Sequence, residues 1–389
     1  GARRGRDPLS DGRRAIDLES RSRGASRDAT GACGRTCEAR AGGAVKLAVI
    51  LFNLGGPDSP QAVEPFLRNL FSDPAIISLP ALLRKPLARL VARRRAPIAR
   101  EIYEKIGGRS PILEETQAQA RALESALEAP GREVRAFIAM RCWKPFADEA
   151  ASAAKTWGAD RIVLLPLYPQ FSTTTTDSSF RDWERAAAAA GLTAPAARVC
   201  CYPFAQGFID AEAGLIRRSW ANRKADVDYR LLLSAHGLPK RVIAKGDPYQ
   251  WQVEQTARAV VDKLGISGLD WRVTYQSRVG PLEWLTPSTD GEIRKGGAQG
   301  KGLIVAPIAF VSEHSETLVE LDIEYARLAR DAGVRDYLRV PAVSADRDFI
   351  LALAGLVNRA VESGHTTTCA PARICPNNFR RCAYGDAQA

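Results

Sequence analysis

Short apolar runs recur along the chain, and each ends near a cluster of glycine, proline, serine or asparagine. Continuous apolar runs of this length are typical of strands that are buried on both faces of a parallel sheet. They predict strands at residues 46–54, 134–140, 161–167, 229–235, 271–275, 302–309 and 337–343. Helical periodicity between these runs predicts helices at residues 113–129, 147–157, 250–264 and 316–332.

Strands that alternate with helices predict a doubly wound α/β architecture. Three or four strands precede residue 200 and four follow it, so we predict two similar Rossmann-like domains, each a parallel sheet flanked by helices. We assign residues 45–200 to the N-terminal domain, 201–362 to the C-terminal domain and 363–389 to a cysteine-containing tail. A ligand cleft is expected between the domains, because parallel sheets of this kind bind ligands at the carboxyl ends of their strands.

The first 44 residues differ from the rest in composition, being rich in arginine, glycine, serine and aspartate without apolar periodicity. Such a composition is typical of disorder. The chain begins with glycine and its single methionine is Met140. We therefore expect residues 1–44 to be either a disordered extension or an artefact of an assigned start, with the native start near Val45.

The net charge of +11 favours an anionic partner, which could be nucleic acid, an acidic membrane surface or a carboxylated small molecule. Nucleic acid is not expected, because the sequence lacks a helix-turn-helix, a finger pattern and the aromatic-basic interleaving of single-strand binders. No apolar run reaches the roughly 18 residues that a membrane-spanning helix needs. The cysteines are too scattered to indicate a disulfide framework, which favours a reducing compartment.

Two of the three histidines follow predicted strands directly. His236 lies in Ser-Ala-His-Gly-Leu-Pro at residues 234–239, and His314 lies in Ser-Glu-His-Ser-Glu at residues 312–316. Imidazole titrates near neutral pH and is a common metal ligand. A single histidine at such a position is commonly structural, but two at strand ends of one predicted cleft favour a function for both.

An acidic segment begins beside His314. Glu316, Glu320 and Glu324 are spaced four residues apart and would lie on one face of a helix. A solvated helix face has the same pattern. Because this one begins two residues after a strand-end histidine, we predict a carboxylate path that guides a metal ion inward or protons outward.

These motifs resemble those of the ferrochelatases, which insert ferrous iron into a porphyrin. The resemblance extends from about residue 46 to 361 and is carried by residues 51–57, 106–111, 165–172, 234–239, 279–284 and 307–325. It implies that His236 is the catalytic histidine, with Glu316 as a facing acid and His314 beside it. His236 and Glu316 would also contact the metal. The porphyrin-binding residues that we expect are Phe52, Arg141, Trp284 and Phe310.

The chain departs from the family pattern after its second predicted strand. Where the bacterial pattern reads Arg-Tyr-Trp-His-Pro, this chain has Arg141-Cys-Trp-Lys-Pro145. Cys142 and Lys144 thus replace a tyrosine and a histidine, which leaves the role of both positions open. Lys144 could instead pair with a porphyrin propionate.

Residues 79–100 combine leucines with arginine and lysine in a basic amphipathic segment. Such a segment can lie on an anionic membrane surface, although a solvated helix packed on the domain has the same composition. In ferrochelatases this region forms the apolar lip of the cleft. We therefore expect a cytoplasmic protein that docks peripherally on the inner membrane.

Three cysteines, Cys369, Cys375 and Cys382, are close together near the C-terminus. Their spacing is not that of a zinc ribbon. Some ferrochelatases hold a 2Fe–2S cluster with C-terminal cysteines and one internal cysteine, and this chain could supply the fourth thiolate from Cys142, Cys200 or Cys201. Three thiols without a ligand on a flexible tail would be the alternative.

The sequence thus predicts a lyase that inserts ferrous iron, its substrate, into protoporphyrin IX with release of two protons, which is the last step of haem biosynthesis. Two alternatives are compatible with the same residues. One is a coproporphyrin or cobalt chelatase of the same fold. The other is a porphyrin- or haem-binding carrier without turnover.

Overall fold

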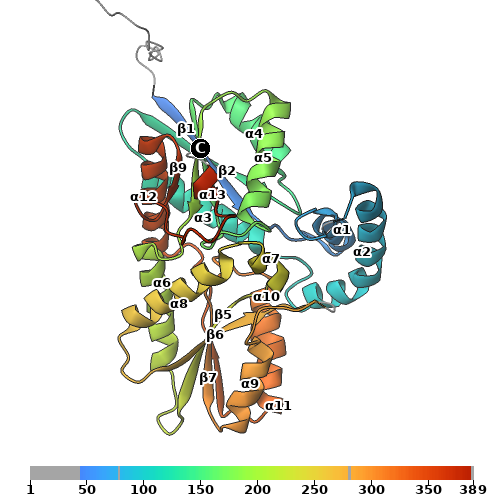
Figure 1. The fold of residues 1–389 in the computed structure, drawn as a ribbon, viewed down its shortest axis with the longest axis vertical. Helices are drawn as coiled ribbons and strands as arrows, with labels where there is room; N and C mark the ends of the chain where they lie inside the picture. Colours follow the sequence, from blue (N-terminus) through green and yellow to red (C-terminus); the bar gives the residue numbers. More distant parts are fainter. Residues whose placement is uncertain (1–43, 78, 279–281, 387–389) are drawn as a thin grey trace, which may run out of the picture. The chain divides into compact units, whose positions relative to one another are not determined.

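The computed structural model describes residues 44–77, 79–278 and 282–386, and nearly all of the predicted extension at residues 1–44 lies outside this part. Two parallel sheets with flanking helices make up the described chain (Figure 1). The first sheet has the strand order β2-β1-β3-β4-β9. Its members are β1 (Val45–Asn53), β2 (Arg132–Met140), β3 (Arg161–Pro166), β4 (Ala196–Cys201) and β9 (Thr366–Thr368).

The second sheet has the order β6-β5-β7-β8 and is also parallel. Its members are β5 (Tyr229–His236), β6 (Asp270–Gln276), β7 (Gly302–Pro307) and β8 (Asp336–Arg339). Seven of these nine strands overlap the apolar runs of the sequence, and the predicted two-sheet fold is confirmed.

Helices connect successive strands. Before residue 200 they are η1 (Pro60–Ala62), α1 (Val63–Ser72), α2 (Ala81–Glu104), α3 (Ile112–Leu127), α4 (Ala147–Trp157) and α5 (Thr176–Ala190). The rest are α6 (Gln206–Ala221), α7 (Lys240–Ala244), α8 (Tyr249–Leu264), α9 (Thr289–Ala298), α10 (Ser315–Leu318), the π-helix η2 (Glu320–Tyr325), α11 (Ala326–Asp331), α12 (Arg347–Ser363) and α13 (Ala383–Asp386).

Alternate residues of β1 pack on opposite faces of the first sheet. Leu47, Val49 and Leu51 join the cluster that contains Leu123 of α3, whereas Ala48, Ile50 and Phe52 join Ala150 of α4 and Phe180 of α5. Successive side chains of a strand point to opposite faces, so a run without polar residues fits only a sheet covered on both sides. This burial explains why β1 has no polar alternation.

The chain returns to the first sheet after β8, which differs from the domain division that we predicted. Helix α12 contributes Phe349 and Leu353 to the core beside Val199 of β4. β9 then pairs with β4, with Thr366 opposite Arg198. Residues 347–368, assigned from the sequence to the second domain and the tail, therefore complete the first sheet. The sequence did not reveal β4 or β9, because Arg198 interrupts the apolar residues of β4 and β9 consists of three threonines.

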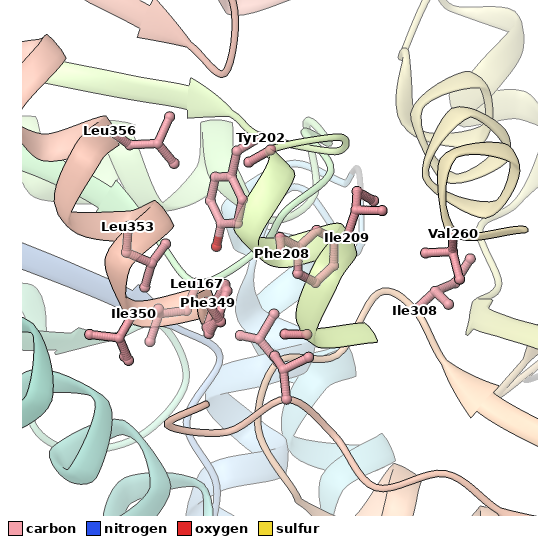
Figure 2. Close-up of a cluster of buried hydrophobic side chains, with 14 of the residues drawn as sticks. Leu167, Tyr202, Phe208, Ile209, Val260, Ile308, Phe349, Ile350, Leu353 and Leu356 are labelled. Atoms are coloured by element: carbon pink, nitrogen blue, oxygen red, sulfur yellow. The ribbon is translucent and has the colours of Figure 1, made fainter. Parts of the chain in front are cut away.

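A single buried cluster extends across the helices between the sheets. Tyr202, Phe208 and Phe349 form its aromatic centre, and the rings of Phe208 and Phe349 lie 5.8 Å apart (Figure 2). Val260 of α8 and Ile308 after β7 continue the cluster toward the second sheet (Figure 2). This continuous apolar packing fixes the strand ends of the second sheet against α8, which also borders the candidate site.

Candidate functional site

The centre of the site lies where β5 ends. His236 is the last residue of this strand and lies in register with Gln276, the last residue of β6. On the other side of β5, the loop that follows β7 leads to α10 and to Glu316. β5 is a central strand, so two neighbouring strand ends deliver their polar loops to His236. This arrangement follows from parallel strands that end at one edge of a sheet.

His236 and Glu316 form a direct hydrogen bond. Nδ1 of His236 lies 3.0 Å from Oε2 of Glu316, and the side chains are 36% and 29% exposed. Burial disfavours the imidazolium, but the charge and the hydrogen bond of Glu316 outweigh it and raise the pKa of His236 above its ordinary value. Burial would raise the pKa of Glu316, but the charges and hydrogen bonds of His236 and His314 outweigh it and hold this pKa well below its ordinary range. Glu316 is therefore ionised at neutral pH.

His314 lies beside the carboxylate of Glu316 as well. Nδ1 of His314 lies 3.1 Å from the carbonyl oxygen of Ser312, and Nε2 lies 3.8 Å from Oε2 of Glu316. A carbonyl only accepts, so Nδ1 must donate, and Nε2 is left to face Glu316. His314 is buried, at 8% exposure. The ring of Phe310 lies 4.8 Å from that of His314 and 6.4 Å from that of His236, which places an aromatic face beside both imidazoles.

Polar groups of β6 hold the first part of the acidic segment. Gln276 donates from Nε2 to the carbonyl oxygen of Glu316 at 2.9 Å and to Oε2 of Glu320 at 3.1 Å. Glu320 also accepts from the backbone N–H and the hydroxyl of Ser277 and from the hydroxyl of Tyr325. Burial, together with the charge of Glu316, still raises the pKa of Glu320. Glu316 and Glu320 thus form a neighbouring pair in which the charge of one carboxylate disfavours ionisation of the other.

Glu324 does not continue this pair, which corrects the predicted line of three carboxylates. The N–H of Glu324 bonds to the carbonyl of Val319, five residues earlier, because residues 320–325 form a π-helix. The wider π turn rotates Glu324 away from the face that a regular helix would give it. Glu324 is exposed and lies 3.5 Å from Nζ of Lys105.

Of the expected porphyrin contacts, Trp284 joins Phe310 near His236. Its strand-like bridge pairs it with Pro239, in the loop that follows His236, and a β-carbon on Gly237 would lie 3.5 Å from its ring. The indole N–H is buried and has no hydrogen-bond partner among the described residues. A β-carbon at Gly237 would lie only 2.8 Å from the carbonyl oxygen of Gln276, so glycine here leaves room for the end of β6 rather than for Trp284.

Phe52 does not lie on an open surface, contrary to our expectation. It is 1% exposed and packs edge-to-face against Phe180 at 5.7 Å, in the core between the first sheet and α5. The even-numbered residues near the end of β1 face α4 and α5, and Phe52 is one of them. Its side chain belongs to the core of the domain.

Arg141 lies on a different part of the first domain. Its guanidinium pairs with Asp73 at 2.9 Å and donates to the hydroxyl of Ser178. Arg141 lines a cavity of about 430 Å³ together with Thr173, Lys245 and other residues. The next residue, Cys142, is buried at 2% exposure, and burial raises the pKa of its thiol to about 12. It packs with α1 and α2 and not with the other cysteines, so it is excluded as their fourth member.

The long helix α2 has two unlike faces. Ala88, Ala92 and Ala96 recur every four residues and are buried, whereas Leu82 and Leu83 are 88% and 62% exposed. Leu87, Leu90 and Ile98 are also exposed, and Lys85, Arg89 and Arg93–Arg95 accompany them. Small residues allow α2 to pack closely on α1 (Figure 1), which leaves the leucines and the cations outward. Within the described ranges, no helix is long and apolar enough to cross a membrane.

Four cysteines converge where the tail meets β4. The thiol of Cys382 contacts those of Cys200 and Cys375, and the thiol of Cys200 contacts that of Cys201. All four are at least nine-tenths buried, and Cys369 lies next to Cys201 through a backbone hydrogen bond of 3.2 Å. Across residues 44–77, 79–278 and 282–386, no three His, Cys, Asp or Glu side chains surround a position for a single metal ion. A two-iron cluster divides its four thiolates between two irons and does not require such a trio.

The comparison with known proteins decides the family. The ferrochelatase family model matches residues 46–361. The chain belongs to the ferrochelatase family. The ferrochelatase of Phenylobacterium zucineum is 54% identical over 341 residues, which cover 87% of this chain and 98% of that protein. The ferrochelatase of Caulobacter vibrioides is 52% identical over 340 residues, with 87% and 97% coverage, and that of Pelagibacter ubique is 47% identical over 341 residues, with 87% and 98%.

The fold itself is that of chelatases. The solved structure of SirB from Bacillus subtilis with Fe³⁺ aligns with a TM-score of 0.50 at 11% identity, over 82% of this chain and 97% of SirB. At this identity the similarity concerns the fold alone. The expected family, the chelatase-like fold and the lyase class of a porphyrin metal chelatase are all confirmed.

Several residues of the ferrochelatase site could not be selected from the sequence. Gln276 and Ser277 were visible only as a polar strand end, and nothing in the pattern tied them to Glu316 or Glu320. Tyr249, whose hydroxyl donates to the carbonyl of His236 at 3.1 Å, lies in a helix that reads as ordinary core. The signal that could have found Gln276 is its place in register with His236, which requires the strand order.

Proposed function

We propose that His236 is the base that takes the two pyrrole protons when this ferrochelatase inserts ferrous iron into protoporphyrin IX to form protohaem. The observation that supports it is the hydrogen bond to Glu316, which occupies Nδ1. With a proton on Nδ1, the lone pair is on Nε2, which has no hydrogen-bond partner in the described part of the chain. This nitrogen can accept a pyrrole proton or contact the incoming iron.

Glu316 orients the imidazole of His236 and stabilises the imidazolium that forms. Its low pKa supports this role, because it stays ionised while His236 changes charge. Glu320 accepts the proton next or steers the iron inward, since its raised pKa makes it a better proton acceptor than an ordinary carboxylate. His314 completes the group, with Nε2 lying 3.8 Å from the same carboxylate oxygen of Glu316.

Phe310 and Trp284 form the porphyrin-contacting wall of the site. Phe310 lies next to both imidazoles, and Trp284 carries a buried indole N–H without a protein partner. A planar macrocycle held against these rings would present its nitrogens to His236. Arg141, farther from the histidines, can bind a propionate only by sharing its guanidinium with Asp73.

Replacing His236 by alanine tests whether this histidine is the base. Under anaerobic conditions with ferrous iron and protoporphyrin IX, haem formation should fall roughly 10²- to 10⁴-fold, the contribution usual for a general base. Binding of the porphyrin, measured by fluorescence, should persist. His365→Ala, at an exposed histidine outside the site, is the matched control. Full activity in His236→Ala would exclude the assigned role.

The same assay separates the reactions open to the fold. Coproporphyrin in place of protoporphyrin, and cobalt in place of iron, test substrate choice. Tight porphyrin binding without any metal insertion would instead indicate a carrier.

The exposed face of α2 docks on an anionic membrane surface, so that the protein works on the cytoplasmic side of the inner membrane. Leu82, Leu83 and Leu90 would enter the interface while the neighbouring cations meet anionic headgroups.

The cysteines near β4 hold a 2Fe–2S cluster. Cys200, Cys375 and Cys382 are linked through their thiols, and Cys201 or Cys369 supplies the fourth ligand. The donors fit, because four buried thiols converge at this place, which is the number of thiolates that a 2Fe–2S cluster takes. A bound cluster would supply one-electron redox chemistry. Charge-transfer bands in the visible spectrum of the purified protein test this proposal, and their absence together with the absence of acid-labile sulfide would reject it.

A further inference from the structure

Gln252, on the first half of α8, is a buried polar residue next to the cysteines. Its side chain is 0% exposed, yet the oxygen and both N–H groups of its amide have hydrogen-bond partners. Oε1 accepts from the backbone N–H of Phe171 at 2.7 Å. Nε2 donates to Sγ of Cys375 at 3.0 Å and to Sγ of Cys201 at 3.4 Å.

The orientation of this amide is fixed by its partners. The N–H of Phe171 can only donate, so the oxygen of the amide must face it and the two amide N–H groups must face the sulfurs. Sulfur in a neutral thiol is a weak acceptor, whereas a thiolate is a strong one. Two donors placed in an apolar interior are satisfied best when both sulfurs carry negative charge, as metal-bound thiolates do. Their position favours Cys201 over Cys369 as the fourth ligand.

The amide is held in place from both ends. α8 is tied to the loop after β3 by Gln170, which donates to Thr256 at 3.0 Å, and by Thr173, which donates to the buried carboxylate of Asp247. Thr256 lies one helical turn after Gln252, and Asp247 lies two residues before α8 begins at Tyr249. Gln252 therefore cannot turn away from the sulfurs without breaking its bond to Phe171 within a rigid segment.

We infer that Gln252 is a positioning residue of the iron–sulfur group, whose two N–H···S bonds raise the reduction potential of that group. The inference rests on the proposed cluster and adds the residue that tunes it. One-electron reduction places further negative charge on the thiolate sulfurs, and hydrogen-bond donors stabilise that charge. Hydrogen bonds to sulfur are among the factors that set such potentials.

The test measures the midpoint potential of the full-length protein, purified anaerobically, by a dye-mediated titration with dithionite. Gln252→Leu keeps the volume of the side chain but removes both donors. We expect it to retain iron and acid-labile sulfide while its reduction equilibrium becomes about tenfold less favourable, a shift of about 59 mV to more negative potential. Gln252→Glu, which replaces the donors by a carboxylate, should shift the potential in the same direction.

Gln119→Leu is the matched control, because Gln119 is also 0% exposed and donates from Nε2 to the carbonyl oxygens of Val311 and Ser344, away from the cysteines. The midpoint potential of Gln119→Leu should equal that of the unmodified protein. If Gln252→Leu does not fold, the midpoint potential of Gln252→Glu tests the role of Gln252. An unchanged potential in a variant that holds the cluster overturns the role of Gln252 alone. A parent protein without cluster absorption or acid-labile sulfide overturns the cluster and, with it, this inference.

Discussion

Nδ1 of His236 lies 3.0 Å from Oε2 of Glu316, although eighty residues separate them in the sequence. The contact joins the end of β5 to the first turn of α10, so it depends on β5 and β7 being neighbours in the sheet. This contact changes the arrangement that we expected for the two residues. The sequence led us to expect a histidine and a carboxylate that face each other, whereas the structure pairs them, with one oxygen of Glu316 shared by His236 and His314.

This pairing predicts a pH dependence for iron insertion. The base form of His236 predominates only above its pKa, which Glu316 raises above the ordinary value of imidazole. The acidic limb of the rate profile should therefore lie above pH 6.5, the ordinary value. In Glu316→Gln the charge is lost while burial still disfavours the imidazolium, so the acidic limb should move to lower pH, with a lower maximal rate. The measurement is the initial rate of haem formation between about pH 5 and 9.

Glu324→Gln serves as the comparison for this experiment. Glu324 is exposed, pairs with Lys105 and lies outside the group around His236. Its acidic limb should coincide with that of the unmodified protein. A profile that moves as far in Glu324→Gln as in Glu316→Gln would contradict the assignment.

A second prediction concerns Ser277, which has a φ angle of 60°, in the left-handed region that costs a residue with a β-carbon about 1 kcal/mol. Its N–H and hydroxyl both bond to Glu320. Ser277→Ala and Ser277→Gly lose the same hydroxyl, so the two variants should show equal losses in the rate of iron insertion. Only glycine relieves the backbone, and Ser277→Gly should be more stable than Ser277→Ala by about 1 kcal/mol in urea unfolding. Equal stabilities would mean that the backbone of Ser277 is not strained.

Much of the fold was predictable because the strands are buried on both faces and therefore form continuous apolar runs. The family motifs supplied His236 and Glu316 directly. The errors have local causes. Glu324 was assigned by a regular helical period, but a π-helix changes the period after Glu320. Phe52 was expected in the porphyrin site, but alternation along β1 turns it toward α4 and α5. The helices that cover each side of a buried strand decide which of its faces points to a ligand. The residue pattern of the strand does not show where those helices lie.

Phe349 provides a test of the packing that joins α12 to the first sheet. It is fully buried and contacts the rings of Tyr202 and Phe208 (Figure 2). Phe349→Ala should reduce the free energy of unfolding by about 3–5 kcal/mol, because it removes a large apolar side chain and leaves a cavity. Leu351→Ala, two residues away on the exposed side of the same helix, should change it by less than about 0.5 kcal/mol. Urea unfolding followed by circular dichroism measures both. A small effect in Phe349→Ala would show that α12 packs loosely.

The last prediction concerns the membrane. If the outer face of α2 enters a bilayer interface, Leu82 and Leu83 together contribute about 3 kcal/mol to binding, since a fully buried leucine contributes about 1.5–3 kcal/mol. Replacing both by serine should weaken binding to vesicles that contain phosphatidylglycerol by roughly a hundredfold, as measured by co-sedimentation. Leu351→Ser, at a leucine that is 50% exposed on α12, should bind like the unmodified protein. High salt should weaken binding of all three proteins, because the cations of α2 act through the surface potential. Equal binding of the double variant and the parent would assign membrane contact to another surface, while haem formation from porphyrin in detergent should be unaffected in either case.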